Sequence, residues 1–417
     1  MQKNWFTTGK FGLFIHFGLY SLLGGEYKGQ KIRGLAEWIL NNGDIPLEEY
    51  RSLAGEFNPQ EFQAENICRL AKSWGMRYIC LTSKHHEGFA LFDSKVSSYN
   101  SVQASPCKRD FVREMQEACE KYGLTFCVYY SQAQDWDDPD AYRAYHDNSH
   151  KNFERYFYGK CLPQVEELLT NYGKIGMIWF DTPIDMSQQH CRELSELVHK
   201  LQPECLISGR IGHGLGDYIS TQDNRIPAAP IEKMWEVAGT MNDSWGFRKG
   251  DENWQTAATT IHKLLKIAAR GGNYLLNIGP DGQGRIPAAC LTELNKVGEY
   301  LEKAGESVYS AYTLPLYVYE INEYCFTARD HQLYITFFNP EKLQGRTFDI
   351  PNICNHVVQA KWLNLPESYN EERMFRETST LEGDPCYIVT LPKNLPNIPA
   401  LTLKLTLAEA DYRQNPL

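Results

Sequence analysis

Residues 174–181, KIGMIWFD, form an apolar run of strand length that ends on a carboxylate, Asp181. The run lies between Gly173 and Pro183 and shows no alternation of polar and apolar residues. Such a run is typical of a strand that is buried on both faces, as in the parallel sheets of α/β proteins. Parallel sheets carry their catalytic residues at the carboxyl ends of the strands. Asp181 therefore occupies the position of a catalytic residue.

Short apolar runs and amphipathic stretches of helical length alternate along the first 305 residues. Strict alternation of strands and helices indicates a parallel sheet. The number of strand-helix units favours a (β/α)8-like TIM barrel, complete or imperfect, over a shorter doubly wound sheet. The other expected strands are 12–16, 78–82, 125–130, 205–208, 234–237 and 274–278, and the expected helices are 64–74, 111–122, 153–169, 191–201, 254–269 and 288–304.

The pattern changes after this region. Alternating strands are expected at Leu316–Tyr319, Tyr324–Thr327 and Leu333–Phe338, and helical periodicity disappears. Several short strands without helices between them are typical of an antiparallel β-sandwich. We therefore predict two domains, a catalytic (β/α) barrel over residues 1–308 and a C-terminal β-sandwich over residues 309–417.

The composition excludes several classes of protein. The 42 basic and 52 acidic residues give a net charge of −10 without a basic patch, so a nucleic-acid partner is not expected. No apolar run approaches the roughly 18 residues of a membrane helix, and the N-terminus lacks the pattern of a signal peptide. We therefore expect a cytoplasmic protein without a membrane partner. The 12 cysteines include no CxxC pair, which disfavours a zinc cluster or a disulfide framework.

Aromatic residues make up 13% of the chain. Sugar-binding sites favour such rings, because the apolar face of a pyranose packs on them while its hydroxyls find polar partners. The tyrosines of the predicted sandwich would also suit a homo-oligomer.

Polar side chains gather where the predicted strands end, and in a parallel barrel these ends meet at one rim. A metal-dependent hydrolase could use such a set, but the spacing lacks the additional carboxylates and the His-x-His pairs expected of ligands, so we predict no metal and no cofactor. Each residue alone also has a structural explanation, such as a turn or a helix cap, and only their joint placement favours a site. The set comprises His16, His85, His86, Tyr130, Asp181 and Arg210.

Seven segments in the first 290 residues, in the same order, closely resemble the α-L-fucosidases of glycoside hydrolase family 29. The resemblance implies a (β/α) barrel followed by a β-sandwich, in agreement with the pattern above. The matching segments are Trp5-Phe6 with Gly12–Ser21, Glu37-Trp38, Lys84–Phe89, Tyr129–Ser131, Trp179–Asp181, Trp235-Glu236 with Ser244–Phe247, and Gly271–Pro280.

The resemblance implies a retaining exo-glycosidase that removes terminal α-L-fucose from a fucosylated glycan through a covalent glycosyl-enzyme. Such enzymes need two carboxyl groups about 5 to 5.5 Å apart, a nucleophile and an acid that later acts as a base. Asp181 matches the family's nucleophile. Asp223 lies 13 residues before Glu236 of the Trp-Glu pair, at a position where the resemblance implies a glutamate in many relatives, and Glu236 is the alternative acid. We favour Asp223, because an acid that must meet varied leaving groups suits a variable loop.

The resemblance also implies the sugar-binding residues. Two other functions stay open: a catalytically silent barrel that only binds fucose, and a glycosidase for a galactose-configured sugar. The latter would need room and a polar partner where Phe14 and Phe247 are expected to face the C6 methyl group of fucose, unless these two are ordinary core aromatics. The remaining predicted contacts of the sugar are His16, Glu37, Trp38, His85, His86, Tyr130, Trp179 and Arg210.

Overall fold

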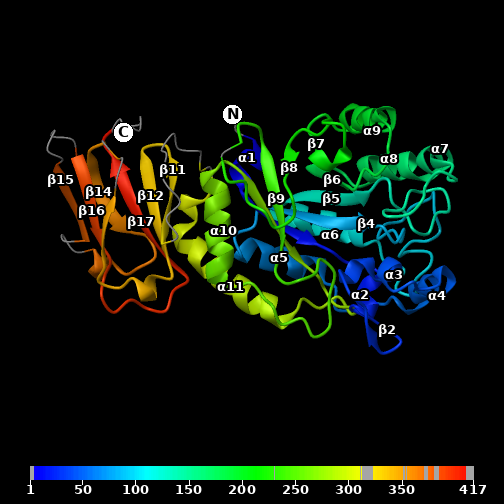
Figure 1. The fold of residues 1–417 in the computed structure, drawn as a ribbon, viewed down its shortest axis with the longest axis horizontal. Coiled ribbons are helices and arrows are strands. Elements are labelled where there is room, and N and C mark those ends of the chain that lie inside the picture. The colour runs from blue at the N-terminus through cyan, green and yellow to red at the C-terminus, as the bar shows by residue number, and fades with distance from the viewer. Residues whose placement is uncertain are drawn as a thin grey trace.

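The computed structural model describes residues 4–229, 231–309, 311, 323–350, 353, 355–370, 374–379 and 385–409. Its main feature is a parallel sheet of eight strands in the order β7-β6-β5-β4-β1-β10-β9-β8 (Figure 1). The strands are β1 (Phe11–Ile15), β4 (Tyr78–Lys84), β5 (Thr125–Ser131), β6 (Met177–Asp181), β7 (Leu206–Ile207), β8 (Ile219–Ser220), β9 (Trp235–Thr240) and β10 (Asn273–Ile278).

The sheet curls until its two edge strands approach each other. The Asp217 amide, two residues before β8, donates to the Ile207 carbonyl of β7 at 2.9 Å. Among the described residues between β7 and β9, which leave out residue 230, the chain forms a 3-10 turn (Gly209–Ile211) and the two-residue strand β8 but no α-helix. The predicted fold class, a TIM-like barrel, is therefore confirmed in its imperfect form.

Helices follow the other strands, and their ends carry the expected signals. Asp110 caps α6 by accepting from the Arg113 amide, and the same helix ends at Gly123, whose φ of 68° is the left-handed conformation that suits glycine. The predicted helix 153–169 is divided by a π-helical turn at Phe157–Cys161. The helices are α1 (Trp5–Gly9), α2 (Tyr20–Leu23), α3 (Ile39–Asn42), α4 (Leu47–Ser52), α5 (Ala64–Ser73), α6 (Phe111–Tyr122), α7 (Phe153–Tyr156), α8 (Leu162–Asn171), α9 (Gln188–Leu201), α10 (Ala257–Ala269) and α11 (Ala288–Ala304); a small hairpin joins β2 (Glu26–Tyr27) to β3 (Gln30–Lys31).

Successive residues of each barrel strand face opposite sides, so each strand contributes to two apolar clusters. Ile178 and Phe180 of β6 face the surrounding helices, whereas Met177 and Trp179 face the lumen. Tyr129 of β5 stacks on Trp179 inside the lumen, with ring centroids 5.8 Å apart. The lumen is thus a packed aromatic floor beneath the carboxyl ends of the strands.

The C-terminal region consists of two antiparallel sheets around a core of their own. The predicted β-sandwich is therefore confirmed, although Leu316–Tyr319 lies outside the described residues. One sheet has the order β11 (Tyr324–Arg329), β12 (Gln332–Phe338), β17 (Ala400–Leu407), β14 (Val357–Trp362), and the other has the order β13 (Thr347–Ile350), β16 (Pro385–Thr390), β15 (Phe375–Ser379).

Helices α10 and α11 lie between the barrel sheet and the sandwich (Figure 1). His262 of α10 stacks on Phe338 of β12 with centroids 3.8 Å apart, and Tyr300 of α11 bonds to Thr402 of β17 at 2.7 Å. The boundary at residues 308 and 309 stays a prediction, because most residues from 310 to 322 lie outside the described ranges. Within those ranges no helix combines the length and apolar character needed to cross a membrane.

Candidate active site

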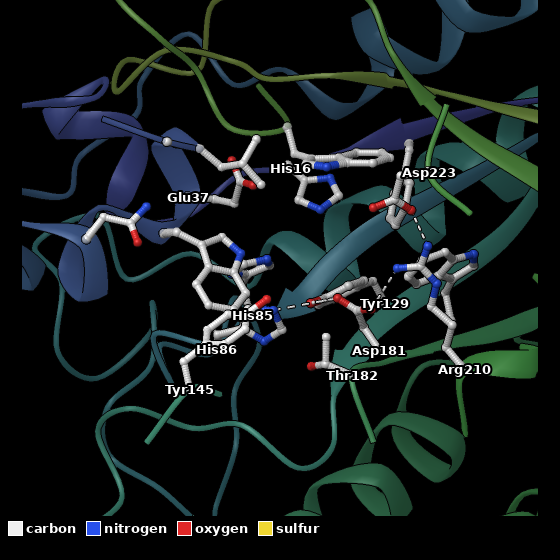
Figure 2. A pocket seen from close by; sticks show the side chains of 17 residues that line it. His16, Glu37, His85, His86, Tyr129, Tyr145, Asp181, Thr182, Arg210 and Asp223 are labelled. Carbon is white, nitrogen blue, oxygen red and sulfur yellow. Dashed lines mark hydrogen bonds and ion pairs between the residues drawn. The ribbon is translucent and has the colours of Figure 1, made fainter. Parts of the chain in front are cut away.

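A pocket of about 310 Å³ opens at the carboxyl ends of the barrel strands (Figure 2). Its size falls within the range of small-molecule sites. Strand ends supply one part of the wall, and loops that follow the strands supply the rest. The lining residues are Phe14, His16, Gly34, Leu35, Glu37, Trp38, Asn42, His85, His86, Tyr129, Tyr145, Trp179, Asp181, Thr182, Arg210, Asp223 and Trp245.

Asp181 is the last residue of β6, and hydrogen bonds hold its carboxylate in the pocket. Its Oδ2 accepts from the Tyr129 hydroxyl at 3.0 Å, and its Oδ1 accepts from Arg210 at 3.0 Å. The side-chain carbonyl of Gln132 fixes the backbone by accepting from the Asp181 amide at 2.8 Å. Burial raises the pKa of Asp181, but the charge of Arg210 and the hydrogen bonds from Arg210 and Tyr129 outweigh it, so the net pKa is lowered. Asp181 is therefore held as a carboxylate.

Arg210 joins Asp181 to a second carboxyl group. Its Nη1 binds Asp181 and its Nη2 binds Asp223, while its guanidinium lies 4.7 Å from the ring centroid of Trp179. Burial raises the pKa of Asp223, Arg210 opposes this, and the nearby charge of Asp181 raises the pKa further, so the net shift is upward. The pocket thus holds two carboxyl groups whose pKa values move in opposite directions, an arrangement typical of acid/base pairs.

Glu236, the alternative acid, does not line this pocket. It is 1% exposed within the lumen and accepts from the Tyr78 hydroxyl at 2.6 Å, the Trp179 indole at 3.0 Å and the Tyr218 hydroxyl at 3.3 Å. Burial raises its pKa to about 7 despite these bonds. Glu236 therefore supports Trp179 from below.

Three neutral imidazoles line the wall opposite Arg210. Burial lowers the pKa of His16 to about 3 and of His86 to about 4, and it also lowers the pKa of His85. The Nδ1 of His16 must donate to the Asn277 side-chain carbonyl at 2.7 Å, since the amide of Asn277 donates elsewhere, to the Trp245 carbonyl. Its Nε2 is then an acceptor, which suits a sugar hydroxyl.

The His86 tautomer follows in the same way. Ser131 donates to the Gln134 carbonyl, so its oxygen must accept from Nδ1 of His86 at 2.6 Å. The Nε2 of neutral His86 is then an acceptor, 3.6 Å from Oδ2 of Asp181.

Glu37 presents a further acceptor. Its Oε2 accepts from the Gly246 amide at 2.9 Å and from the Ser244 hydroxyl at 3.2 Å. Its buried Oε1 has no hydrogen-bond partner among the described residues. Because a buried acceptor without a partner is costly, a ligand hydroxyl at Oε1 would be strongly favoured.

Buried polar bonds hold the loop that carries His85 and His86. Lys84, at the end of β4, donates from Nζ to Asp135 at 2.9 Å and to the Tyr156 hydroxyl at 2.8 Å. Glu87 accepts from the Leu19 amide at 3.1 Å and from the Tyr50 hydroxyl. The histidine pair is thus fixed from both ends.

Comparison with known proteins assigns the family. The profile of the α-L-fucosidases matches residues 1–306. The chain belongs to the α-L-fucosidase family. The expected enzyme class, a glycoside hydrolase of this type, is confirmed by that membership.

Relatives and solved structures agree with this assignment. The tissue α-L-fucosidase of Mus musculus is 30% identical over 329 residues, which cover 74% of this chain and 71% of that protein. The crystal structure of an α-L-fucosidase from Vibrio sp. strain EJY3 superposes with a TM-score of 0.91 at 29% identity and covers 99% of this chain and 73% of that chain. The α-L-fucosidase AlfC from Lactobacillus casei, solved with α-L-fucose, has a TM-score of 0.68 at 42% identity and covers 72% of this chain and 98% of that one.

Two residues expected to contact fucose lie outside the pocket of this family member. Tyr130 is fully buried on the helix side of β5, where its hydroxyl donates to Gln164 at 2.9 Å, because neighbouring residues of a strand face opposite ways. The structure places Tyr129 at the pocket instead. Phe247 packs beside Gly24, and Trp245, two residues earlier, lines the pocket. At the pocket, Tyr129 thus takes the place predicted for Tyr130, and Trp245 takes the place predicted for Phe247.

Apart from Glu236, the other predicted residues do meet at the pocket. The structure adds Tyr145, which is 95% exposed at the pocket edge, the loop residues Gly34, Leu35 and Thr182, and Asn42 at the end of α3. No sequence signal marks them, because they lie in irregular loops or, for Asn42, at the end of a helix of only four residues. The described parts of the chain contain no group of three or more His, Cys, Asp or Glu side chains suited to hold a metal ion.

Replacing Tyr129 with phenylalanine is expected to shift the acid limb of the pH-rate profile to higher pH. The Tyr129 hydroxyl stabilises the Asp181 carboxylate, so its removal raises the pKa of Asp181, and a reaction that needs the carboxylate then fails at a higher pH. Profiles of kcat/KM against pH would measure the shift. Tyr130→Phe removes the neighbouring hydroxyl, which bonds to Gln164 outside the pocket, and should leave the limb unmoved. An unmoved limb in Tyr129→Phe would contradict this role.

Proposed function

We propose that this protein is a retaining exo-α-L-fucosidase that hydrolyses terminal α-linked L-fucose from oligosaccharides or glycoconjugates through a covalent glycosyl-aspartate. The observation that carries the proposal is the pair of Asp181 and Asp223 in one pocket, both bound to Arg210, with pKa values shifted in opposite directions. Such a pair suits a nucleophile and a general acid.

In the first step the Asp181 carboxylate attacks C1 of fucose, and the bond from C1 to the leaving oxygen breaks. Asp223 donates its proton to that oxygen, so the leaving alcohol departs neutral. The ester formed at Asp181 carries no charge. The repulsion that raised the pKa of Asp223 is thereby removed, and Arg210 stabilises the Asp223 carboxylate that results.

In the second step Asp223 acts as the base. It takes a proton from water, which attacks C1 and releases Asp181. The net change is hydrolysis with two inversions at C1, and therefore retention of the anomeric configuration.

The other pocket residues suit recognition of the sugar. The acceptors on His16, His86 and Glu37 match the hydroxyl groups of a pyranose, and a sugar epimer would leave them without partners. His85 and Trp38 complete the same wall. Phe14 and Trp245 supply apolar rings suited to the C6 methyl group, which favours fucose over a sugar with a hydroxymethyl group there.

Proton NMR of the first product formed tests this function directly. Hydrolysis of 4-nitrophenyl α-L-fucopyranoside is expected to release α-L-fucose first, and the β-anomer should appear only later by mutarotation. Release of β-L-fucose first would show inversion and contradict a glycosyl-aspartate. Absence of hydrolysis of this and of natural fucosides would contradict the fucosidase function itself. A homo-oligomer and a cytoplasmic location stay predictions.

A further inference from the structure

The turn that directly follows Asp181 has an unfavourable backbone conformation. Thr182 has a φ of 50°, in the left-handed region that β-branched residues rarely occupy. It also precedes Pro183, and an extended backbone is favoured before proline. Such strain persists only where surrounding contacts hold it, and it is frequent at functional sites. The contacts that hold this turn therefore bear on the direction of the Asp181 side chain.

Two buried glutamines, Gln132 and Gln134, bind this turn. Both follow Ser131, the last residue of β5, which pairs with Asp181 in the sheet. Gln134 donates from its side-chain amide to the Thr182 hydroxyl at 3.0 Å. Gln132 accepts from the Asp181 amide at 2.8 Å. The segment after β5 thus holds the strained turn at two successive residues.

Gln132 also reaches the backbone that carries the arginine of the pocket. Its Nε2 donates to the Arg210 carbonyl at 2.9 Å, while its Oε1 accepts from the Asp181 amide. Only this orientation of the side chain suits both groups, because a backbone amide donates and a carbonyl accepts. One buried side chain therefore connects the two main-chain segments whose side chains form the ion pair of 3.0 Å between Arg210 and Asp181.

We propose that Gln132 is a positioning residue of the fucosidase reaction, which holds the backbones of Asp181 and Arg210 at the spacing that aims the nucleophile into the pocket. The proposal rests on the proposed function, in which Asp181 attacks C1. Without Gln132 the Asp181 amide and the Arg210 carbonyl would lose this partner, which favours a shift of both segments. A displacement of about 1 Å at a reacting group can lower the rate about 10²-fold.

Gln132→Met tests this role, because methionine has a similar length but can form neither hydrogen bond. With 4-nitrophenyl α-L-fucopyranoside, kcat is expected to fall about 10- to 100-fold and KM to change less than about three-fold, since Gln132 is not among the described residues that line the pocket. The acid limb of the pH profile of kcat/KM should move to higher pH. A looser ion pair with Arg210 raises the pKa of Asp181, so the carboxylate is lost at a higher pH.

Gln164→Met is the matched control. Gln164 of α8 is also fully buried, accepts from the Tyr130 hydroxyl at 2.9 Å and donates to the Ser94 hydroxyl at 3.1 Å. The same change there also removes two hydrogen bonds, but outside the pocket. It should lower the melting temperature and leave kcat and the acid limb near those of the wild type. Equal effects of the two variants on kcat and on the acid limb would overturn the proposal.

Gln132→Glu decides the question even if Gln132→Met does not fold. A protonated glutamic acid can form both bonds, whereas a carboxylate cannot donate to the Arg210 carbonyl. Burial and the charge of Asp181 favour the protonated form as the pH falls. The kcat of this variant relative to the wild type should therefore be higher at about pH 5 than at about pH 8. A ratio that does not depend on pH would overturn the proposal, whereas a wild type that hydrolyses no fucoside would contradict the fucosidase function instead.

Discussion

Asp181→Asn is expected to fold normally and to lose turnover of 4-nitrophenyl α-L-fucopyranoside by on the order of 10⁴-fold or more. The amide has nearly the same shape as the carboxylate, but it carries no charge and cannot form the ester at C1. Wild type and variant would be compared by steady-state kcat, with thermal melts to verify folding. Asp349→Asn makes the same chemical change at an exposed position of β13 in the sandwich and should retain full activity.

Asp181→Ala extends this test, because the shorter side chain leaves room for an external anion. Azide is expected to restore turnover by attacking C1 from the vacated side, and the product should be β-L-fucosyl azide. Retention of most of the wild-type rate in Asp181→Asn would contradict the nucleophile assignment. Rescue that yields the α-azide would contradict it as well.

The barrel could be predicted from sequence because its strands are apolar runs with clear ends. The run that ends at Asp181 and the helix Phe111–Tyr122 lie where their residue patterns place them. Strand β8 was missed, because the two residues Ile219 and Ser220 are too few to show periodicity. The pairing that places β8 beside β9 depends on contacts distant in sequence.

The pocket could be predicted to the level of strand ends but not of side-chain direction. The strand is buried on both faces, so Tyr129 and Tyr130 both have apolar surroundings. The sequence therefore does not show which of the two faces the lumen. The pairing of Ser131 with Asp181 and of Tyr129 with Trp179 decides it. Tyr145 was missed for another reason, since its loop has no periodic pattern that would place it above the pocket.

The sequence also could not show which of the two candidate acids faces the pocket. By the resemblance to the family, Glu236 belongs to the Trp-Glu motif, whereas Asp223 stands where a glutamate is expected. The structure separates them by surroundings: Glu236 is enclosed by three hydrogen-bond donors in the lumen, and Asp223 lines the pocket beside Arg210. An acid must reach the leaving oxygen, and only Asp223 lines the cavity in which that oxygen would lie.

Asp223→Asn and Glu236→Gln are therefore expected to lose activity in different ways. Without its acid, Asp223→Asn should lose about 10²- to 10⁴-fold in kcat/KM on a fucosyl disaccharide, whose leaving sugar needs a proton, and much less on the 4-nitrophenyl fucoside, whose leaving group departs readily as an anion. Azide should speed the second step of this variant and yield α-L-fucosyl azide, since Asp181 still forms the ester.

Glu236→Gln should instead lower kcat/KM by a similar factor on both substrates, because it disturbs Trp179 rather than proton transfer. The substitution replaces one of the two acceptor oxygens of Glu236 by an amide group, which is a donor and would face another hydrogen-bond donor. This should lower the free energy of unfolding by about 1 to 3 kcal/mol. Urea denaturation and both kinetic assays would be measured on the same preparations. If Glu236→Gln showed the dependence on leaving group and formed the α-azide, while Asp223→Asn lost both activities equally, the acid would be Glu236. The bonds from Tyr78 and Trp179 would then have to break before each turnover.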